Sequence, residues 1–431
     1  MKFSKNEIIK SNGSTMKVLD LLGDGGQGEV YLVDYDHNKY ALKIYKDIQY
    51  DDFKNNLRSN IEKGSPSDNF LWPKKLVELE DGNFGYLMDL RPNNYSSFVS
   101  YLNGKDGFKD RKTMIKWCIE LCTSFKKLHE MGYSYQDLND GSFFFDGDTG
   151  ELLICDNDNV TANQKNLGVL GKIKYMAPEI VRGDALPDTH SDRFSLAVIL
   201  FMTLCLGNPF EGERLKNYNI IDEKAELELY GTKPLFVYHK TDKSNRPVRG
   251  YHASVLKRWP TLPTYIKEAF HRTFVDGLQD RENGRTTEIE WIKQLCRYRD
   301  ELISCPKCGV EYIKGLAENK PNLVCPYCGA NSKKLSVLVI GKSYIVLELG
   351  KKIYKHHIDK YSSDYLTEVG VVIANKNNPS LWGIKVSLNH DILVKDSKGV
   401  EKTIQANGVI PIVKDLKVKF SDETIGVIYE Q

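Results

Sequence analysis

The sequence predicts an α+β fold, in which a small β-rich lobe precedes a larger helical lobe and two smaller segments follow. Over residues 15–89, short apolar runs alternate with Gly and Asp, which predicts antiparallel strands and one polar helix near residues 52–63. Over residues 111–299 the apolar side chains recur with a helical period. From residue 335 onward strand-like runs return, and they predict an all-β sandwich.

These changes of pattern give the expected domains. Residues 1–92 and 93–300 form the two lobes, residues 301–333 hold two cysteine pairs, and residues 334–431 form the β-rich domain. The chain has 431 residues, 41% of them hydrophobic, which is enough for a large core and excludes a disordered or fibrous protein. Its 60 Lys and Arg against 58 Asp and Glu leave a formal charge of +2, so we expect no nucleic-acid and no membrane partner.

The cysteines and the N-terminus favour a cytoplasmic location. The nine cysteines are odd in number and unevenly spaced, unlike a secreted disulfide framework. The first residues contain no apolar stretch typical of a signal peptide. The uncharged stretch at residues 194–210 is short for a membrane span, and we expect it to be a buried core helix.

A glycine-rich loop at residues 23–28 lies between two predicted strands. Because a dinucleotide-binding loop would be followed by a helix, this one is better explained as a hairpin whose backbone N–H groups cover phosphates. The next strand carries Lys43, whose ammonium can neutralise nucleotide phosphates. Taken alone, the glycine-rich loop could also be an ordinary turn, and Lys43 could also be a solvated surface lysine.

Five further motifs follow in order along the chain: Asp137 in a polar loop, Asp156 after an apolar strand, Ala177-Pro178-Glu179, Asp192 and Arg285. Together with the glycine loop and Lys43, this series resembles the eukaryotic-like (Hanks-type) Ser/Thr protein kinases over about residues 15–299. The stretches around residues 57–73 and 258–274 are similar to a bacterial subgroup of these kinases. The resemblance implies a bilobal protein-kinase-like fold.

The resemblance also implies roles for individual residues. Asp137 would accept the proton of the substrate hydroxyl, Lys43 would contact ATP phosphates, and Asp156 would hold Mg²⁺ or Mn²⁺. The expected ATP-binding residues are Gly23, Gly25, Gly26, Gly28, Val30, Ala41, Lys43, Met88 and Leu90. Glu179, Arg285 and Asp192 would be scaffold residues.

Three positions depart from the family pattern, and a fourth keeps the family's spacing at an unusual place in its helix. Gln136 replaces the Arg that binds a phosphorylated activation loop, so activation by loop phosphorylation is not expected. Asn139 replaces a Lys near the γ-phosphate, and Ser142 replaces an Asn that holds a second Mg²⁺, which leaves Ser142 a weaker magnesium ligand. Glu62 has the spacing of the helical glutamate that pairs with Lys43, although it lies near the end of its helix.

The leading expectation is therefore a protein kinase that transfers the γ-phosphate of MgATP to Ser/Thr hydroxyls of a protein substrate, including itself, with activity weakened by these departures. One alternative is a pseudokinase scaffold that binds nucleotide and partners without useful catalysis. Phosphorylation of a small molecule is a third alternative, which the Ala-Pro-Glu motif disfavours because that motif is typical of kinases with protein substrates.

The two cysteine pairs are Cys305/Cys308 and Cys325/Cys328, each in a Cys-Pro-x-Cys-Gly motif. Two such knuckles supply four thiolates for a closed structural Zn²⁺ site, and the segment resembles a zinc ribbon. A redox dithiol and a pair of disulfides are the alternatives. His356 and His357 are not needed as ligands, and we expect both at the surface.

The β-rich tail is expected to carry a docking or regulatory partner. It is faintly similar to a forkhead-associated module, which reads phosphothreonine, but it contains no Arg after Arg299 to bind a phosphate. Its lysines only slightly outnumber its carboxylates, which is too mild a basic charge for a nucleic-acid surface.

Overall fold

The computed structural model describes residues 2–47, 50–168, 171–316, 318 and 321–430. The chain divides into two compact units. The first consists of Met1–Phe108, Leu121–Leu256 and Phe270–Glu288, and the second of Lys109–Glu120, Lys257–Ala269 and Ile289–Gln431. Contacts therefore group helix α10 (Glu288–Glu301) with the cysteine pairs and the tail, whereas the sequence pattern places a boundary at residue 300.

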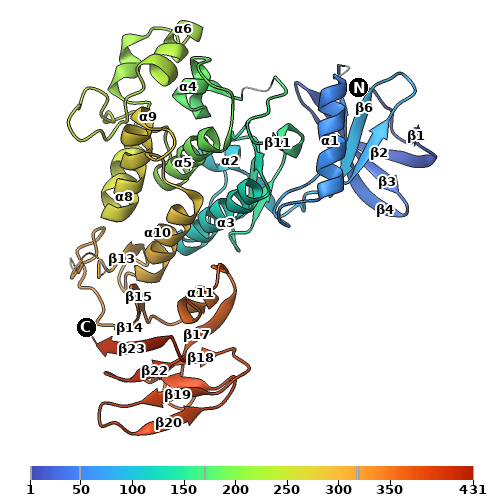
Figure 1. Ribbon diagram of the computed structural model, residues 1–431. Helices are drawn as coiled ribbons and strands as arrows, with labels where there is room; N and C mark the ends of the chain where they lie inside the picture. The colour runs from blue at the N-terminus through green and yellow to red at the C-terminus, as the bar shows by residue number, and fades with distance from the viewer. Residues whose placement is uncertain (1, 48–49, 169–170, 317, 319–320, 431) are drawn as a thin grey trace. The chain divides into compact units, whose positions relative to one another are not determined.

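Six antiparallel strands form the N-terminal sheet of the first unit, in the order β1-β2-β3-β4-β6-β5 (Figure 1). Helix α1 (Asp51–Lys63) packs on this sheet through Phe53 and Leu57, which share a buried cluster with Tyr45, Phe84 and Tyr86. The strands and the single polar helix agree with the sequence prediction. Strand bounds are Ile8–Ser11 (β1), Ser14–Asp24 (β2), Gly28–Tyr35 (β3), Asn38–Tyr45 (β4), Lys75–Glu78 (β5) and Phe84–Met88 (β6).

The rest of the first unit is mainly helical. Helix α5 (Thr189–Cys205) is buried from Phe194 to its end, so the uncharged stretch is a core helix as expected. Among the described residues, no helix is both long and apolar enough to cross a membrane. Three of the other elements, α3, α7 and α8, lie partly in the second unit. The other elements up to residue 279 are Tyr95–Ser97 (β7), Phe98–Leu102 (α2), Arg111–Glu130 (α3), Tyr133–Ser134 (β8), Phe143–Asp146 (β9), Leu152–Ile154 (β10), Thr161–Ala162 (β11), Pro178–Val181 (α4), Glu223–Glu226 (α6), Ala253–Arg258 (α7), Thr264–His271 (α8) and Gly277–Gln279 (α9).

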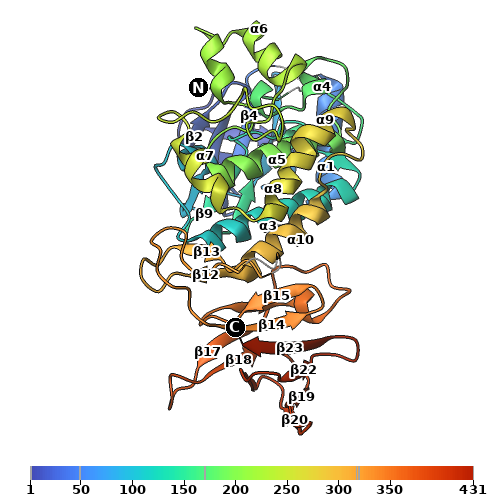
Figure 2. The ribbon, with the colours of Figure 1, turned by 90° about the vertical axis from the view of Figure 1, so that its left-hand side faces the viewer.

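The second unit contains the two-stranded β12-β13 sheet and the tail. The tail has a six-stranded sheet, β15-β14-β23-β22-β19-β20, and a four-stranded sheet, β16-β17-β18-β21 (Figure 2). Apolar side chains from both sheets form one buried cluster, including Leu338, Ile353, Ile384 and Ile428, which is the arrangement expected of a sandwich. Element bounds are Leu302–Ser304 (β12), Glu311–Ile313 (β13), Ser336–Ile340 (β14), Ser343–Val346 (β15), Lys352–Tyr354 (β16), Lys355–Ile358 (α11), Glu368–Ala374 (β17), Trp382–Val386 (β18), Ile392–Lys395 (β19), Glu401–Ile404 (β20), Val409–Pro411 (β21), Lys417–Lys419 (β22) and Ile425–Glu430 (β23).

Buried polar contacts join helix α10 to the tail. The Lys351 ammonium donates to the backbone carbonyls of Arg299, Asp300 and Leu302 at 3.1, 3.1 and 2.7 Å. Arg299 and Asp300 lie in the last turn of α10, whose carbonyls have no partner within the helix, and Leu302 is the first residue of β12. Lys351 therefore acts as a C-cap supplied from the tail. This cap is one buried contact that ties α10 to the tail within the second unit.

His357 is buried and His356 is half-buried, so the expectation that both lie at the surface was wrong for His357. His357 is 4% exposed, its Nε2 lies 2.9 Å from Asp300 Oδ2, and its Nδ1 accepts from the backbone N–H of Tyr354. The ring of His356 packs on that of His357 with centroids 4.0 Å apart. The error arose because only the tertiary fold brings α11 to the end of α10.

We expect Lys351→Met to destabilise the second unit by about 2 kcal/mol, because three buried carbonyls lose their common donor. Hydrogen exchange in the last turn of α10, together with urea unfolding, would measure this loss. The neighbouring Lys352→Met is the matched control, since Lys352 is exposed and, among the described residues, forms a surface ion pair with Glu368. Equal stability of the two variants would contradict the capping role.

Candidate active site

The glycine-rich loop is the hairpin between β2 and β3. The N–H of Gly25 donates to the carbonyl of Gly28 at 2.9 Å, which closes the turn. A Cβ on Gly28 would lie 2.5 Å from the carbonyl oxygen of Ile44, so this position requires glycine. A strand follows the loop, as predicted, and not a helix.

The apolar residues expected around the adenine come from neighbouring strands of the same sheet. Val30 on β3 pairs with Lys43 on β4, and Ala41 on β4 pairs with Met88 on β6. Leu90 follows β6 by two residues and is half-buried. The sheet thus brings Val30, Ala41 and Met88 together, next to the glycine hairpin.

Lys43 forms a buried ion pair beneath this sheet. Its Nζ lies 2.8 Å from Asp158 Oδ2 and 3.6 Å from Asp156 Oδ1. Asp158 is fully buried and also accepts from the hydroxyl of Tyr45 at 2.6 Å. Burial favours the neutral forms, but the charges of the pair outweigh it, so the pKa of Asp158 is lowered and that of Lys43 is raised.

Asp156 differs from Asp158 in its exposure. Its side chain is 53% accessible to solvent, although surrounding protein raises its pKa and the Lys43 ammonium only partly offsets this rise. Its backbone lies in the left-handed region, with φ 53° and ψ 43°. Of the two carboxylates near Lys43, Asp156 is therefore the one free to take a further cation.

Asp137 lies in a loop held by its own side chains. Asn139 Nδ2 donates to Asp137 Oδ1 at 2.8 Å, and Asn139 Oδ1 accepts from the N–H of Gly141. Burial raises the pKa of Asp137, the hydrogen bond from Asn139 lowers it, and the charge of Asp156 raises it again. Asp137 and Asp156 are thus close enough to feel each other's charge, as a site for a shared ligand requires.

Residues 16–275 match the family described as protein kinase domain, which is more than half of the chain. The chain belongs to the protein kinase domain family. Its helical and β-rich lobes within these residues are the bilobal fold that the family implies.

Curated relatives are similar over about half of this chain. Ribosomal protein S6 kinase 2 alpha of Gallus gallus is 27% identical over 233 residues, and ribosomal protein S6 kinase alpha-1 of Rattus norvegicus is equally similar. Ribosomal protein S6 kinase alpha-2 of Homo sapiens is 24% identical over 236 residues. The match covers 51–52% of this chain and 30–31% of each relative, so this chain spans about a third of the length of these relatives.

Glu62 is not brought to Lys43 in this kinase domain. It is exposed near the C-terminal end of α1, whereas the inward face of that helix carries Asn56 and Asn60. Both amides donate to the carbonyl of Val160, at 2.8 and 2.7 Å. The expected partner is therefore corrected: Lys43 pairs with Asp158 and not with Glu62, a contact that spacing along the sequence did not reveal.

Gln136 contacts the segment that follows Asp156. Its Nε2 donates to the hydroxyl of Thr161 and to the carbonyl of Lys165. Neutral hydrogen bonds thus hold the start of this segment to the loop of Asp137, where the family pattern has an Arg. No phosphate is needed for these contacts.

Two buried ion pairs support the helical part of the first unit, and Asp192 of one pair holds the loop of Asp137. Asp192 accepts from the N–H groups of Tyr135 and Gln136 at 2.6 and 3.0 Å, and its Oδ2 lies 3.0 Å from His129 Nε2. Glu179 and Arg285 form a two-bonded pair with both distances 2.8 Å. These contacts agree with the scaffold roles that the resemblance implies.

His129 makes the stability of this scaffold depend on pH. Burial alone would lower its pKa, but hydrogen bonds with Asp192 and Glu288 raise it from 6.5 to about 9. A raised pKa in the folded state stabilises the protein below pH 6.5, and this contribution is lost as pH rises through 9. We expect the unfolding free energy of the kinase domain to fall by on the order of 3 kcal/mol across that window. Urea unfolding at several pH values would measure this fall, and His129→Gln should remove the dependence.

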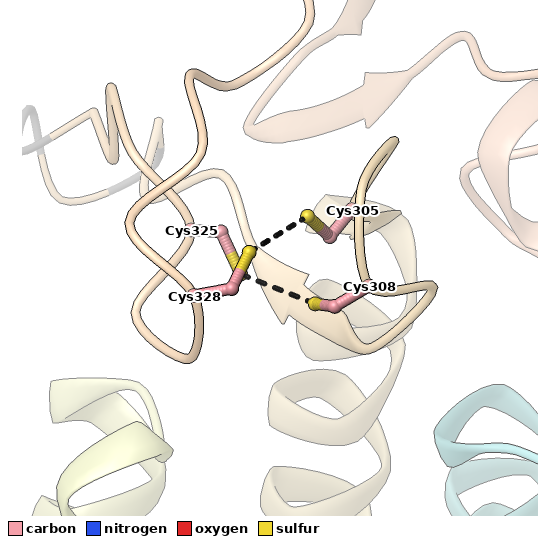
Figure 3. A group of neighbouring side chains, drawn as sticks. All are labelled: Cys305, Cys308, Cys325 and Cys328. Carbon is pink, nitrogen blue, oxygen red and sulfur yellow. Dashed lines mark hydrogen bonds between the residues drawn. The ribbon is translucent and has the colours of Figure 1, made fainter.

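The four predicted cysteines meet in one cluster (Figure 3). Their sulfur atoms all lie within 4.8 Å of one another. Cys305 and Cys328 sulfurs are 3.6 Å apart and those of Cys308 and Cys325 are 3.8 Å apart, so each contact joins one knuckle to the other. A disulfide needs sulfurs about 2.05 Å apart, so the geometry here is that of free thiols.

The two knuckles have the same backbone design. Gly309 and Gly329 have φ of +71° and +69°, in the left-handed region that favours glycine. The backbone N–H of Lys307 points to the Cys305 sulfur at 3.4 Å, and that of Tyr327 points to the Cys325 sulfur at the same distance. Tetrahedral Zn–S bonds of about 2.3 Å separate neighbouring sulfurs by about 3.8 Å, so the cluster fits zinc.

Proposed function

We propose that this chain is a Ser/Thr protein kinase that transfers the γ-phosphate of MgATP to a hydroxyl of a protein substrate. The observation that carries the proposal is the gathering of Lys43, Asp156 and Asp137 beside a glycine hairpin whose backbone can approach phosphates. The similarity to S6 kinases supports a Ser/Thr protein substrate. The Ala-Pro-Glu motif and its Glu179–Arg285 pair support this substrate class over a small molecule.

Each residue has a distinct part in this proposal. Lys43 contacts ATP phosphates, and Asp137 orients the substrate hydroxyl and takes its proton. Asp156 would hold Mg²⁺, with Ser142 as a weaker second ligand. When bound, the metal offsets the charge of the β- and γ-phosphates. Val30, Ala41, Met88 and Leu90 would surround the adenine, and Gly23, Gly25, Gly26 and Gly28 would cover the phosphates.

We further propose that activity does not depend on phosphorylation of the loop after Asp156. The amide of Gln136 already ties that segment to the loop of Asp137, through Thr161 and the carbonyl of Lys165. A neutral amide offers no charge for a phosphate to pair with. The kinase would then be controlled elsewhere, and the β-rich tail is our proposed docking or regulatory domain.

The cysteine cluster is proposed as a structural zinc ribbon, residues 301–333. Four thiolates fill a tetrahedral site and leave no position for substrate. The ribbon is tied to the start of α3: Glu311 accepts from the N–H of Arg111, and Tyr327 accepts from the Arg111 guanidinium. Zinc would therefore stabilise the second unit without taking part in catalysis.

A pseudokinase scaffold is the second candidate function. It is favoured by Asn139 and Ser142, which remove a cation and a metal ligand from the expected set. The two functions differ in one measurable property, phosphoryl transfer. A scaffold would bind ATP and release no ADP.

A transfer assay with γ-³²P-ATP decides between them. Purified wild-type protein with Mg²⁺ or Mn²⁺ is expected to label itself or a generic protein acceptor on Ser or Thr. Asp137→Asn keeps the shape of the side chain but cannot take a proton, and it should lower the rate by about 10³-fold. ATP binding without any label above the Asp137→Asn background would establish the scaffold instead.

A further inference from the structure

The loop that carries Asp137 contains no cation of its own. Residues 135–142 include no Lys or Arg, and Asn139 stands where the family pattern has a Lys. Transfer of a phosphoryl group places negative charge on its equatorial oxygens, and a preorganised positive group stabilises this charge. Another element must supply that group if this loop acts on ATP.

Lys172 reaches the loop from the segment between β11 and α4. Its Nζ lies 2.7 Å from Asp140 Oδ1. A Cβ built on Gly141 would lie only 3.8 Å from the same nitrogen. The neighbouring Gly171, with φ +85°, lies so close to the loop that a Cβ there would be 3.1 Å from Asp137 Oδ1. The backbone at Gly171 thus packs closely against Asp137, and the Lys172 ammonium lies beside the loop of Asp137, in contact with Asp140.

The ammonium acts on three carboxylates of the site, Asp140, Asp137 and Asp156. It lowers the pKa of Asp140 directly, and its charge also acts to lower those of Asp137 and Asp156, which burial raises. The Lys172 side chain is 53% exposed, whereas that of Asp140 is 16% exposed. The Lys172 ammonium is therefore held by Asp140 on one side and is accessible to an anionic ligand from solvent on the other.

We propose that Lys172 is a catalytic residue that contacts the γ-phosphate of ATP and replaces the cation missing at Asn139. This inference rests on the proposed kinase function and names a residue that the family pattern does not place there. In the reaction, the substrate oxygen bonds to phosphorus while its proton passes to Asp137. The bond from phosphorus to the bridging oxygen breaks, and ADP leaves with the electron pair. Lys172 offsets the charge of the phosphoryl oxygens during this exchange.

Two measurements test the proposal: the transfer rate and the preference for ATP over ADP in titration calorimetry with Mg²⁺. Lys172→Met is expected to lower kcat by about 10²-fold or more and to abolish the ATP-over-ADP preference, while ADP affinity stays unchanged. Lys172→Arg keeps the charge and should retain most of that preference. Lys165→Met is the matched control, because Lys165 is exposed in the same segment and makes no ion pair among the described residues. It should behave as the wild type.

Restoring a lysine in the loop gives the sharpest test. Asn139→Lys added to Lys172→Met should recover at least a tenth of the wild-type kcat. No such recovery is expected if Lys172 only anchors its segment to Asp140. If Asp140→Asn reproduces every defect of Lys172→Met and the added lysine recovers nothing, Lys172 only anchors the segment. Unchanged kcat and nucleotide preference in Lys172→Met would also overturn the inference. If the wild type transfers no phosphate, the proposed function fails separately, and the ATP-over-ADP preference still decides the role of Lys172.

Discussion

Replacing Asp156 with alanine is expected to abolish Mg²⁺-dependent ATP binding and phosphoryl transfer. Asp156 is the exposed carboxylate near Lys43, while Asp158 is fully buried and committed to Lys43 and Tyr45. Without Asp156, no described carboxylate beside Lys43 is open to a metal. The ATP phosphates then lose the cation that offsets their charge, and the transfer rate should fall by about 10³-fold or more.

Calorimetry with and without EDTA, beside a transfer assay, measures both losses. Glu62→Ala is the matched control, because Glu62 is exposed at the end of α1 and does not contact Lys43. It should bind ATP and transfer phosphate at wild-type levels. Equal ATP affinity of Asp156→Ala and wild type at saturating Mg²⁺ would refute the metal-ligand assignment.

Replacing Cys308 with serine is expected to release one zinc ion per chain and to unfold the ribbon. Structural zinc contributes about 10–16 kcal/mol to the folding of small zinc peptides, which exceeds what a segment of this size can recover by packing. Because Glu311 and Tyr327 contact Arg111, the loss should extend to the first turn of α3. ATP binding by the first unit should stay largely intact.

Metal analysis and hydrogen exchange together check this outcome. Exchange should rise at residues 303–331 and near Arg111, and remain unchanged in the N-terminal sheet. Lys307→Ala, an exposed position between the two cysteines of one knuckle, should keep its zinc. A Cys308→Ser variant with stoichiometric zinc, or one that loses ATP binding, would show that the metal has a different role.

Much of this architecture could be predicted because its signals are local. The glycine hairpin, the two Cys-Pro-x-Cys-Gly knuckles and the buried helix α5 each depend on residues close together in the chain. The backbone of a tight turn or of a zinc knuckle can adopt only a few conformations, so a short sequence motif is enough to specify it.

What could not be predicted depends on contacts between distant residues. Glu62 has a suitable spacing from Lys43, but the spacing does not determine which face of α1 turns inward. Asn56 and Asn60 take that face because their amides satisfy the carbonyl of Val160, which is about 100 residues away. Similarly, no local pattern indicates that Lys172 lies beside Asp140, or that His357 is buried against Asp300.

The cap on helix α10 has a consequence for the folding of this chain during its synthesis on the ribosome. A chain is synthesised from its N-terminus, and domains fold as they emerge. The carbonyls of Arg299, Asp300 and Leu302 leave the ribosome about 50 residues before Lys351, their donor. We therefore expect the end of α10 to remain frayed until the first strands of the tail have been translated. A message that stopped before residue 351 would yield a kinase domain whose last helix lacks its cap.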